Sequence, residues 1–139
     1  MKSVLVGNAN ADSWRLALDD VSAGEQIVAL KGELRAGFFH AVTPMCIAPA
    51  VLSRFAADLR ELDKTLKGSA TLDSSNQQSA VRFTLAVDHA GHIKAAGRYE
   101  INGNVLDFSF RTDQTQLAPL VRWLDSVLAE YEKTTVQER

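Results

Sequence analysis

The sequence is poor in cysteine, since Cys46 is its only one. A single cysteine excludes a disulfide within the chain and a zinc site built from several thiolates, and it is typical of proteins in a reducing compartment. Long apolar runs are also missing: His40, Thr43 and Pro44 interrupt the longest, whereas a membrane span needs roughly 20 apolar residues. The first residues contain no hydrophobic region of signal-peptide length. We therefore expect a cytoplasmic protein that does not enter a membrane.

An excess of charge of one sign is also missing. The 139 residues include 15 Lys and Arg against 17 Asp and Glu, which gives a formal net charge of −2, and both signs are interspersed along the chain. Proteins that follow a phosphate backbone usually gather their basic residues into a patch or stripe. On this ground we expect no nucleic-acid partner.

The composition that is present belongs to a globular domain. Apolar residues make up 46% of the chain and charged residues 23%, which is far from the signature of a disordered protein. A chain of this length buries about two-thirds of its unfolded surface, which is enough for one hydrophobic core. We predict a single domain over residues 1–139, in which the polar segment 132–139 is a frayed tail.

Two segments have the period of an amphipathic helix. Over residues 49–66 the apolar side chains recur at spacings of three and four, which places them on one stripe. Residues 117–131 have a wider apolar face, and Asp113 or Thr115 can cap the start of that helix. Trp123 falls beside the stripe of the second helix rather than within it.

The other segments alternate between apolar and polar residues, as half-buried strands do. The clearest runs are 13–19 and 80–87, and Asn102-Gly103 is typical of a tight hairpin turn, so 81–110 is predicted to be a three-stranded meander. We expect the polar stretch 73–79 to be a loop. The grouping of strands and helices predicts an α+β fold, with a mainly antiparallel sheet of about six or seven strands and two amphipathic helices packed on it.

Two groups of residues are the nearest approach to reactive sites. Asp88, His89 and His92 have the spacing of three metal ligands, but no fourth ligand is evident and a polar hairpin turn is the interpretation we prefer. Cys46 with His40 could form a thiol nucleophile, but its apolar neighbours favour a small core residue. We expect neither a metal site nor a catalytic residue.

The polar run 112–115 joins a predicted strand to the second helix. Backbone N–H groups at such a junction can hold an anion, but capping of the helix explains the same residues without a ligand, and we prefer that interpretation. The glycines match neither the Walker nor the dinucleotide-binding pattern, so we expect no nucleotide or other cofactor.

Four aromatic residues cannot be assigned to core-facing positions from the pattern alone. They are Trp14, Phe38, Trp123 and Tyr131. Because aromatic side chains are frequent anchors in protein interfaces, our hypothesis is that at least one of the four contacts a partner. The alternative is that they complete the edge of the core.

The order of residues resembles a known family. The likeness extends from about residue 28 to 128 and is found in Leu52-x-x-Phe55-x-x-x-Leu59, Leu66-x-Gly68-x-Ala70-x-Leu72, Phe83-x-Leu85-x-Val87-Asp88, Gly91-His92-Ile93 and Phe108-x-Phe110-x-Thr112-Asp113-Gln114. In these motifs the chain is similar to small bacterial proteins of the WapI type, which are regarded as immunity proteins for contact-dependent polymorphic toxins. The shared positions are chiefly apolar and turn residues that determine a fold, and the family brings no catalytic motif to transfer.

Composition and resemblance together imply a non-catalytic domain that binds another protein, and the resemblance further implies that this protein is a toxin to be neutralised. A homodimer formed by strand edges, or by Trp123 and Tyr131, is a further arrangement. The alternative function is a small-ligand-binding or enzymatic domain, with a pocket between sheet and helices lined by Phe83, Phe108 or Tyr99.

Overall fold

A computed structural model describes residues 3–8, 10–22, 24–75, 79–88 and 91–137. Within these residues the chain forms eight strands, a short 3₁₀ helix and two α-helices. Their bounds are β1 (Ser3–Gly7), β2 (Ser13–Ser22), β3 (Ile27–Ala36), β4 (Phe39–Ile47), α1 (Pro49–Thr65), β5 (Ser69–Ser75), β6 (Ser79–Val87), β7 (Ile93–Ile101), β8 (Asn104–Thr112), η1 (Gln114–Gln116) and α2 (Leu117–Gln137).

The strands form two antiparallel sheets of four. Sheet A has the order β1-β2-β3-β4 and sheet B the order β5-β6-β7-β8, so every strand pairs with its neighbour in the sequence. The predicted α+β class is confirmed, and the expected single sheet of six or seven strands becomes eight strands in two sheets. The pattern did not separate the sheets because α1 leads the chain from one layer to the other, which is a tertiary arrangement.

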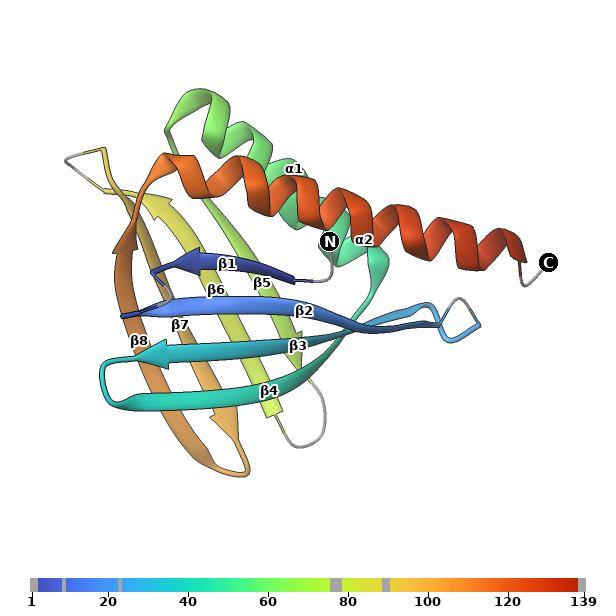
Figure 1. The fold of residues 1–139 in the computed structure, drawn as a ribbon, viewed down its shortest axis with the longest axis horizontal. Coiled ribbons are helices and arrows are strands. Elements are labelled where there is room, and N and C mark those ends of the chain that lie inside the picture. Colours follow the sequence, from blue (N-terminus) through green and yellow to red (C-terminus); the bar gives the residue numbers. More distant parts are fainter. Residues whose placement is uncertain (1–2, 9, 23, 76–78, 89–90, 138–139) are drawn as a thin grey trace.

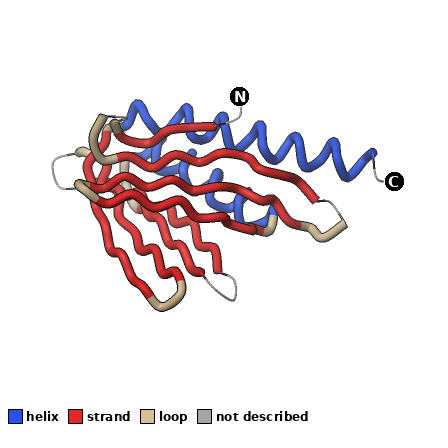
Figure 2. Tube along the Cα trace, turned by 60° about the horizontal axis from the view of Figure 1, so that its bottom comes forward, coloured by secondary structure: helices blue, strands red, loops and turns tan. Residues whose placement is uncertain are grey.

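The two sheets lie face to face, with their strands crossing at a steep angle, and both helices cover the same side of the strands (Figures 1 and 2). Helix α1 contacts α2 and β5, while α2 also contacts β1 and β2. The helices therefore close the side where the sheets diverge, and the outward faces of both sheets remain exposed.

An aromatic cluster joins the two sheets at the centre of the core. The Trp14 ring of sheet A stacks on Phe83 of sheet B, with ring centroids 3.7 Å apart. The indole N–H of Trp14 donates a 2.7 Å hydrogen bond to the Tyr99 hydroxyl of β7. Burial raises the pKa of this hydroxyl well above its usual value, although the bond from Trp14 opposes the shift. Phe83, Phe108 and Tyr99 therefore pack against one another and Trp14 instead of lining a ligand pocket.

The helices begin where the sequence predicts, and the second extends further than expected. Helix α1 ends at Thr65 with Leu66 in the left-handed conformation, where its N–H donates to the carbonyl of Leu62. Helix α2 continues to Gln137, so the prediction of a frayed segment from residue 132 is wrong for 132–137. This segment contains neither proline nor glycine, and the hydroxyl groups of Thr134 and Thr135 donate to backbone carbonyls one turn earlier.

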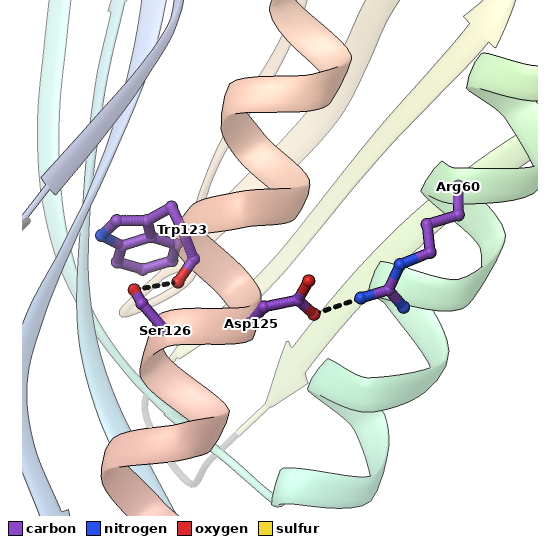
Figure 3. A network of polar contacts seen from close by, with 4 residues as sticks. All are labelled: Arg60, Trp123, Asp125 and Ser126. Carbon is purple, nitrogen blue, oxygen red and sulfur yellow. Dashed lines mark hydrogen bonds and ion pairs between the residues drawn. The ribbon is translucent and has the colours of Figure 1, made fainter.

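Trp123 is fully buried although it lies beside the predicted stripe. Helix α2 packs against α1 on one side and sheet A on the other, so it needs a wider apolar face than a helix with one neighbour. Figure 3 shows Arg60 of α1 paired with Asp125 of α2, while the Trp123 indole points toward the strands of sheet A.

The predicted loop over 73–79 is partly strand. Asp73 to Ser75 complete β5 and pair with β6, whereas residues 76–78 lie outside the described residues. The three-stranded meander over 81–110 is confirmed as β6, β7 and β8. Polar side chains concealed the end of β5, because its outward face meets water.

Candidate functional site

The four aromatic residues chosen as interface candidates occupy very different environments. Trp14 and Trp123 are completely buried, which contradicts their selection as surface anchors, because the core already covers their rings. Tyr131 is partly buried against the core from α2. Phe38 is fully exposed at the turn between β3 and β4. Of the four, Phe38 alone presents its whole ring to solvent.

The turn that carries Phe38 is fixed by a contact from the neighbouring loop. Gly37 has a left-handed backbone with φ of +61°, and its N–H donates a 2.8 Å hydrogen bond to the Asp12 side chain before β2. Phe39 follows as the first residue of β4 and is 63% exposed. Two adjacent phenyl rings are therefore presented on a turn that is held in place.

A surface hollow lies beside this turn. It has a volume of about 410 Å³, and its lining includes Asn10, Arg35, Phe38, Phe39 and His40. The hollow thus combines two apolar rings with a guanidinium, an imidazole and a carboxamide. These groups could contact either a protein side chain or a planar heterocycle.

Strand β4, which forms the edge of sheet A, continues the apolar surface. Val42 is 47% exposed, and Pro44 and Cys46 are exposed two and four residues further along the same outward face. Pro44 has no N–H to donate to an added strand, so it discourages edge-to-edge sheet pairing. Side chains, rather than backbone pairing, are therefore what this edge offers to a partner.

The outward face of sheet A carries unequal numbers of positive and negative groups. Arg15 of β2 lies opposite Glu33 of β3, and Arg35 lies opposite His40 of β4. Lys31 and Arg35 flank Glu33 along the strand, and alternation places all of these side chains on the same face. We call this set, Arg15, Lys31, Glu33, Arg35 and His40, the cationic face; it has three permanent positive charges and one carboxylate.

The outward face of sheet B is arranged differently. Asp73, Arg82, Arg98 and Asp107 lie in one row across the four strands. Arg82 contacts Asp73 at 2.9 Å, and Arg98 contacts Asp107 at 2.8 Å. The hydrogen bond from Arg98 lowers the pKa of the Asp107 carboxyl. The arginines are thus paired with carboxylates, and together they line an open hollow of about 680 Å³.

A third hollow, of about 570 Å³, lies between β2 and α2. Its lining includes Asp19 and Asp20 at a β-bulge, and Glu130 of α2.

Among the residues that the structure describes, no three His, Cys, Asp or Glu side chains are placed to hold a metal ion. His89, one of the three residues with the spacing of metal ligands, lies outside these residues.

The interpretation of Cys46 as a core residue is wrong. The alternation of β4 turns Met45 and Ile47 inward, so Cys46 points outward and is exposed. His40 is six residues away on the same strand and contacts Glu33 at 3.2 Å. The separation along an extended strand, roughly 20 Å, is too large for a thiol–imidazole pair.

The polar run at the start of the second helix acts as a cap, as predicted. Asp113 is the N-cap of η1, and its side chain accepts a 2.9 Å hydrogen bond from the N–H of Thr115. Gln114 donates to the carbonyl and the side chain of Asp63, which ties this junction to the end of α1.

Neither helix in the described part of the chain has the length and apolar character that crossing a membrane requires.

Solved structures share this architecture at low sequence identity. The MRP1/MRP2 structures of Trypanosoma brucei match with a TM-score of 0.54 and 13% identity, covering 91% of this chain and 81% of the other. WHY1 from Arabidopsis thaliana matches with a TM-score of 0.55 and 8% identity over the same shares. A guide-RNA-binding protein complex bound to a gRNA matches with a TM-score of 0.54 and 12% identity, covering 91% of this chain and 88% of that one.

These neighbours contradict the prediction that nucleic acid is excluded as a partner. One of them is a guide-RNA-binding protein in complex with its gRNA, so this fold is compatible with nucleic-acid binding. The prediction rested on net charge, which averages over the whole surface, whereas binding depends on how charged groups are distributed locally. The identities are low, and the likeness establishes the fold alone.

No curated protein sequence matches this chain at a significant level. A family model does match, and it covers residues 8–132, which include β2 to β8 and most of α2. The chain therefore belongs to the immunity protein WapI-like family.

Proposed function

We propose that this chain neutralises a toxin by binding it, and that the Phe38 turn is the centre of the contact. Membership of an immunity protein family supports the role. The observation that carries the site is the fully exposed Phe38 ring, on a turn that Asp12 holds in place. Neutralisation by binding needs a complementary surface and no reacting group.

The exposed Phe38 ring offers a favourable contact with little loss of conformational entropy on binding. Burying a phenylalanine side chain is worth about 1.5–3 kcal/mol, and less conformational freedom is lost when the supporting backbone is already fixed. Phe39 and Val42 add partly exposed apolar surface beside it. Aromatic anchors surrounded by polar groups are typical of the residues that dominate binding energy in protein interfaces.

The test is binding to the toxin domain that we expect to be encoded beside this chain, with both proteins purified. We expect a stable complex by size-exclusion chromatography, and protection of cells that produce the toxin. Phe38→Ala should weaken the complex by about 2 kcal/mol, or roughly 30-fold. The matched control is Val105→Ala, because Val105 is a 51% exposed apolar residue on β8 of sheet B.

Failure of wild-type chain and toxin domain to associate would refute the proposed function. Equal losses for Phe38→Ala and Val105→Ala would instead preserve the function and reject the Phe38 turn as its centre.

A second candidate function is the binding of single-stranded nucleic acid at the same turn. The hollow lined by Phe38, Phe39 and Arg35 supports it, because aromatic rings stack on bases and guanidinium groups contact phosphates. The shared fold with a gRNA-bound protein is consistent with this candidate. Fluorescence anisotropy with a labelled single-stranded RNA of about 12 nucleotides tests it; an unchanged signal at micromolar protein would reject it.

A further inference from the structure

We propose that the protein partner docks an acidic surface on the cationic face of sheet A, next to the part of the partner that contacts Phe38. This inference rests on the proposed function and specifies the chemistry of the partner. The surface consists of Arg15, Lys31, Glu33, Arg35 and His40, with Phe38, Val42 and Pro44 along its border.

The positive groups of this face are not neutralised within the chain. Glu33 is engaged by His40, whose Nε2 lies 3.2 Å from the carboxylate. Arg15 donates a long hydrogen bond of 3.4 Å to the Ser3 hydroxyl. In the described part of the chain, no ion pair involves Arg15, Lys31 or Arg35. Three exposed cations therefore remain available to an external anion.

The cations are close enough to act together. Neighbouring strands are about 4.8 Å apart and alternate residues about 6.7 Å, so Arg15 lies roughly 8 Å from Lys31 and from Arg35. This spacing is about one Debye length at physiological salt, so the three positive potentials add, and Glu33 at their centre offsets one of them. An acidic partner surface would be attracted and oriented by this patch before Phe38 makes contact.

The other acidic groups of sheet A lie toward the end opposite the Phe38 turn: Asp20 pairs with Ala29, so by the same spacings it lies roughly 8 Å from Lys31 and much farther from Arg35. Asp19 and Asp20 follow the β-bulge at the far end of β2, where they line the hollow against α2. Phe38 lies at the other end, at the turn after β3. The sheet is therefore polarised along its strands, and its positive end, around Arg35, coincides with the exposed ring.

The arrangement fits an acidic protein better than a nucleic acid. Glu33 lies among the cations and would face the phosphates of a strand laid across the sheet, which is repulsive. A partner protein can donate a hydrogen bond to the Glu33 carboxylate while the partner's acidic residues pair with the cations. Val42 and Pro44 at the border suit apolar side chains, and of the three border residues only Phe38 offers an aromatic ring for base stacking.

The experiment measures affinity for the purified toxin domain by surface plasmon resonance at about 50 mM and about 300 mM salt. The test variant is Lys31→Glu with Arg35→Glu. The control is Lys94→Glu with Arg111→Glu, a cross-strand pair on the outward face of sheet B that changes net charge equally. Thermal melting first establishes that both variants are folded.

We expect the test variant to lose affinity at least tenfold at low salt, mainly through slower association, while the control changes by less than about threefold. The wild-type complex should weaken as salt rises, and the test variant should show a smaller salt dependence. A complex that forms but is insensitive to the test variant overturns this inference and preserves the proposed function. Equal losses in both variants overturn it too, because only overall charge would matter.

Two other outcomes also decide the matter. If no complex forms with wild-type chain, the proposed function fails and this inference fails with it. If the labelled RNA binds the wild-type chain and loses affinity in the test variant but not in the control, the cationic face belongs to nucleic acid and the acidic-protein proposal is overturned.

Discussion

The outward faces of the two sheets have the same architecture and opposite electrostatic designs. On sheet B, Arg82 and Arg98 each contact an aspartate on the next strand, so positive charge is answered within the protein. On sheet A, Lys31 and Arg35 form no ion pair in the described residues, and the adjoining turn exposes Phe38. The comparison teaches that the pairing of charged residues matters more than their number. A surface whose charges are paired within the protein has few groups left for a partner, whereas unpaired charges can bind one.

Glycines beneath the two faces give the largest expected effect. A Cβ at Gly97 of sheet B would lie 2.1 Å from the Arg82 carbonyl oxygen and 2.7 Å from the Phe108 ring. We expect Gly97→Ala to lower the free energy of unfolding by about 3 kcal/mol or more, because the Arg82 backbone cannot move away from the added methyl group without disturbing the sheet. At Gly32 of sheet A the contacts are 2.9 Å to the Tyr99 hydroxyl and 3.0 Å to the Met45 sulfur, so Gly32→Ala should cost about 1–2 kcal/mol.

Urea denaturation of both variants measures this difference. A Gly97→Ala protein within 1 kcal/mol of wild type, or one more stable than Gly32→Ala, would show that the core beneath sheet B is looser than the structure indicates.

The bond between Trp14 and Tyr99 tests whether the two faces belong to one rigid body. Tyr99→Phe leaves the buried indole N–H without its acceptor, so we expect a loss of about 1–3 kcal/mol in the free energy of unfolding. Because the folded state raises the pKa of Tyr99, this residue also contributes stability below pH about 10 that declines above it. Unfolding followed between pH 7 and about 11 should show a weaker alkaline decline for Tyr99→Phe; parallel curves would contradict the assignment.

The Asp12 contact tests the turn on sheet A alone. Asp12→Ala removes the acceptor for the Gly37 N–H, which should cost about 0.5–1.5 kcal/mol of stability. It should also weaken partner binding several-fold, because binding would then have to order the Phe38 turn. Asp73→Ala on sheet B is the control, since it removes the contact to Arg82 and leaves the turn intact. Equal affinity for the two variants would indicate that the turn is ordered without Asp12.

The smallest effect is expected on the paired face. Arg98 lowers the pKa of Asp107, so this carboxylate stabilises the fold above pH about 4, and its contribution is lost as pH falls through the depressed folded-state value. Asp107→Asn should lower the melting temperature slightly at neutral pH and have no effect at pH about 2. Solvent screens this exposed pair, so a large shift would mean that the row on sheet B supports more than the pair itself.

Local patterns predicted most of the fold, and long-range pairing determined the rest. The helix stripe from Leu52 to Leu62 and the cap at Asp113 depend on neighbours within one turn, which the sequence displays directly. Trp123 was misplaced because its burial depends on α2 packing against two partners at once.

Of the candidate site, the sequence singled out only Phe38, as one of four aromatic residues proposed for an interface. Its ring is exposed because it lies at the tip of the turn between β3 and β4. The cationic face could not be predicted, because Arg15 and Glu33 are brought together by strand pairing across 18 positions. A register, rather than a local motif, carries that signal.

The most direct test of the account compares the two faces in one experiment. Backbone amide signals of the ¹⁵N-labelled chain would be recorded with and without the unlabelled toxin domain. We expect the largest changes at Gly37, Phe38 and Val42, with the signals of Thr84 and Arg98 nearly unchanged. Largest changes at Thr84 and Arg98, with an unperturbed Phe38 turn, would show that recognition belongs to sheet B and would contradict the account.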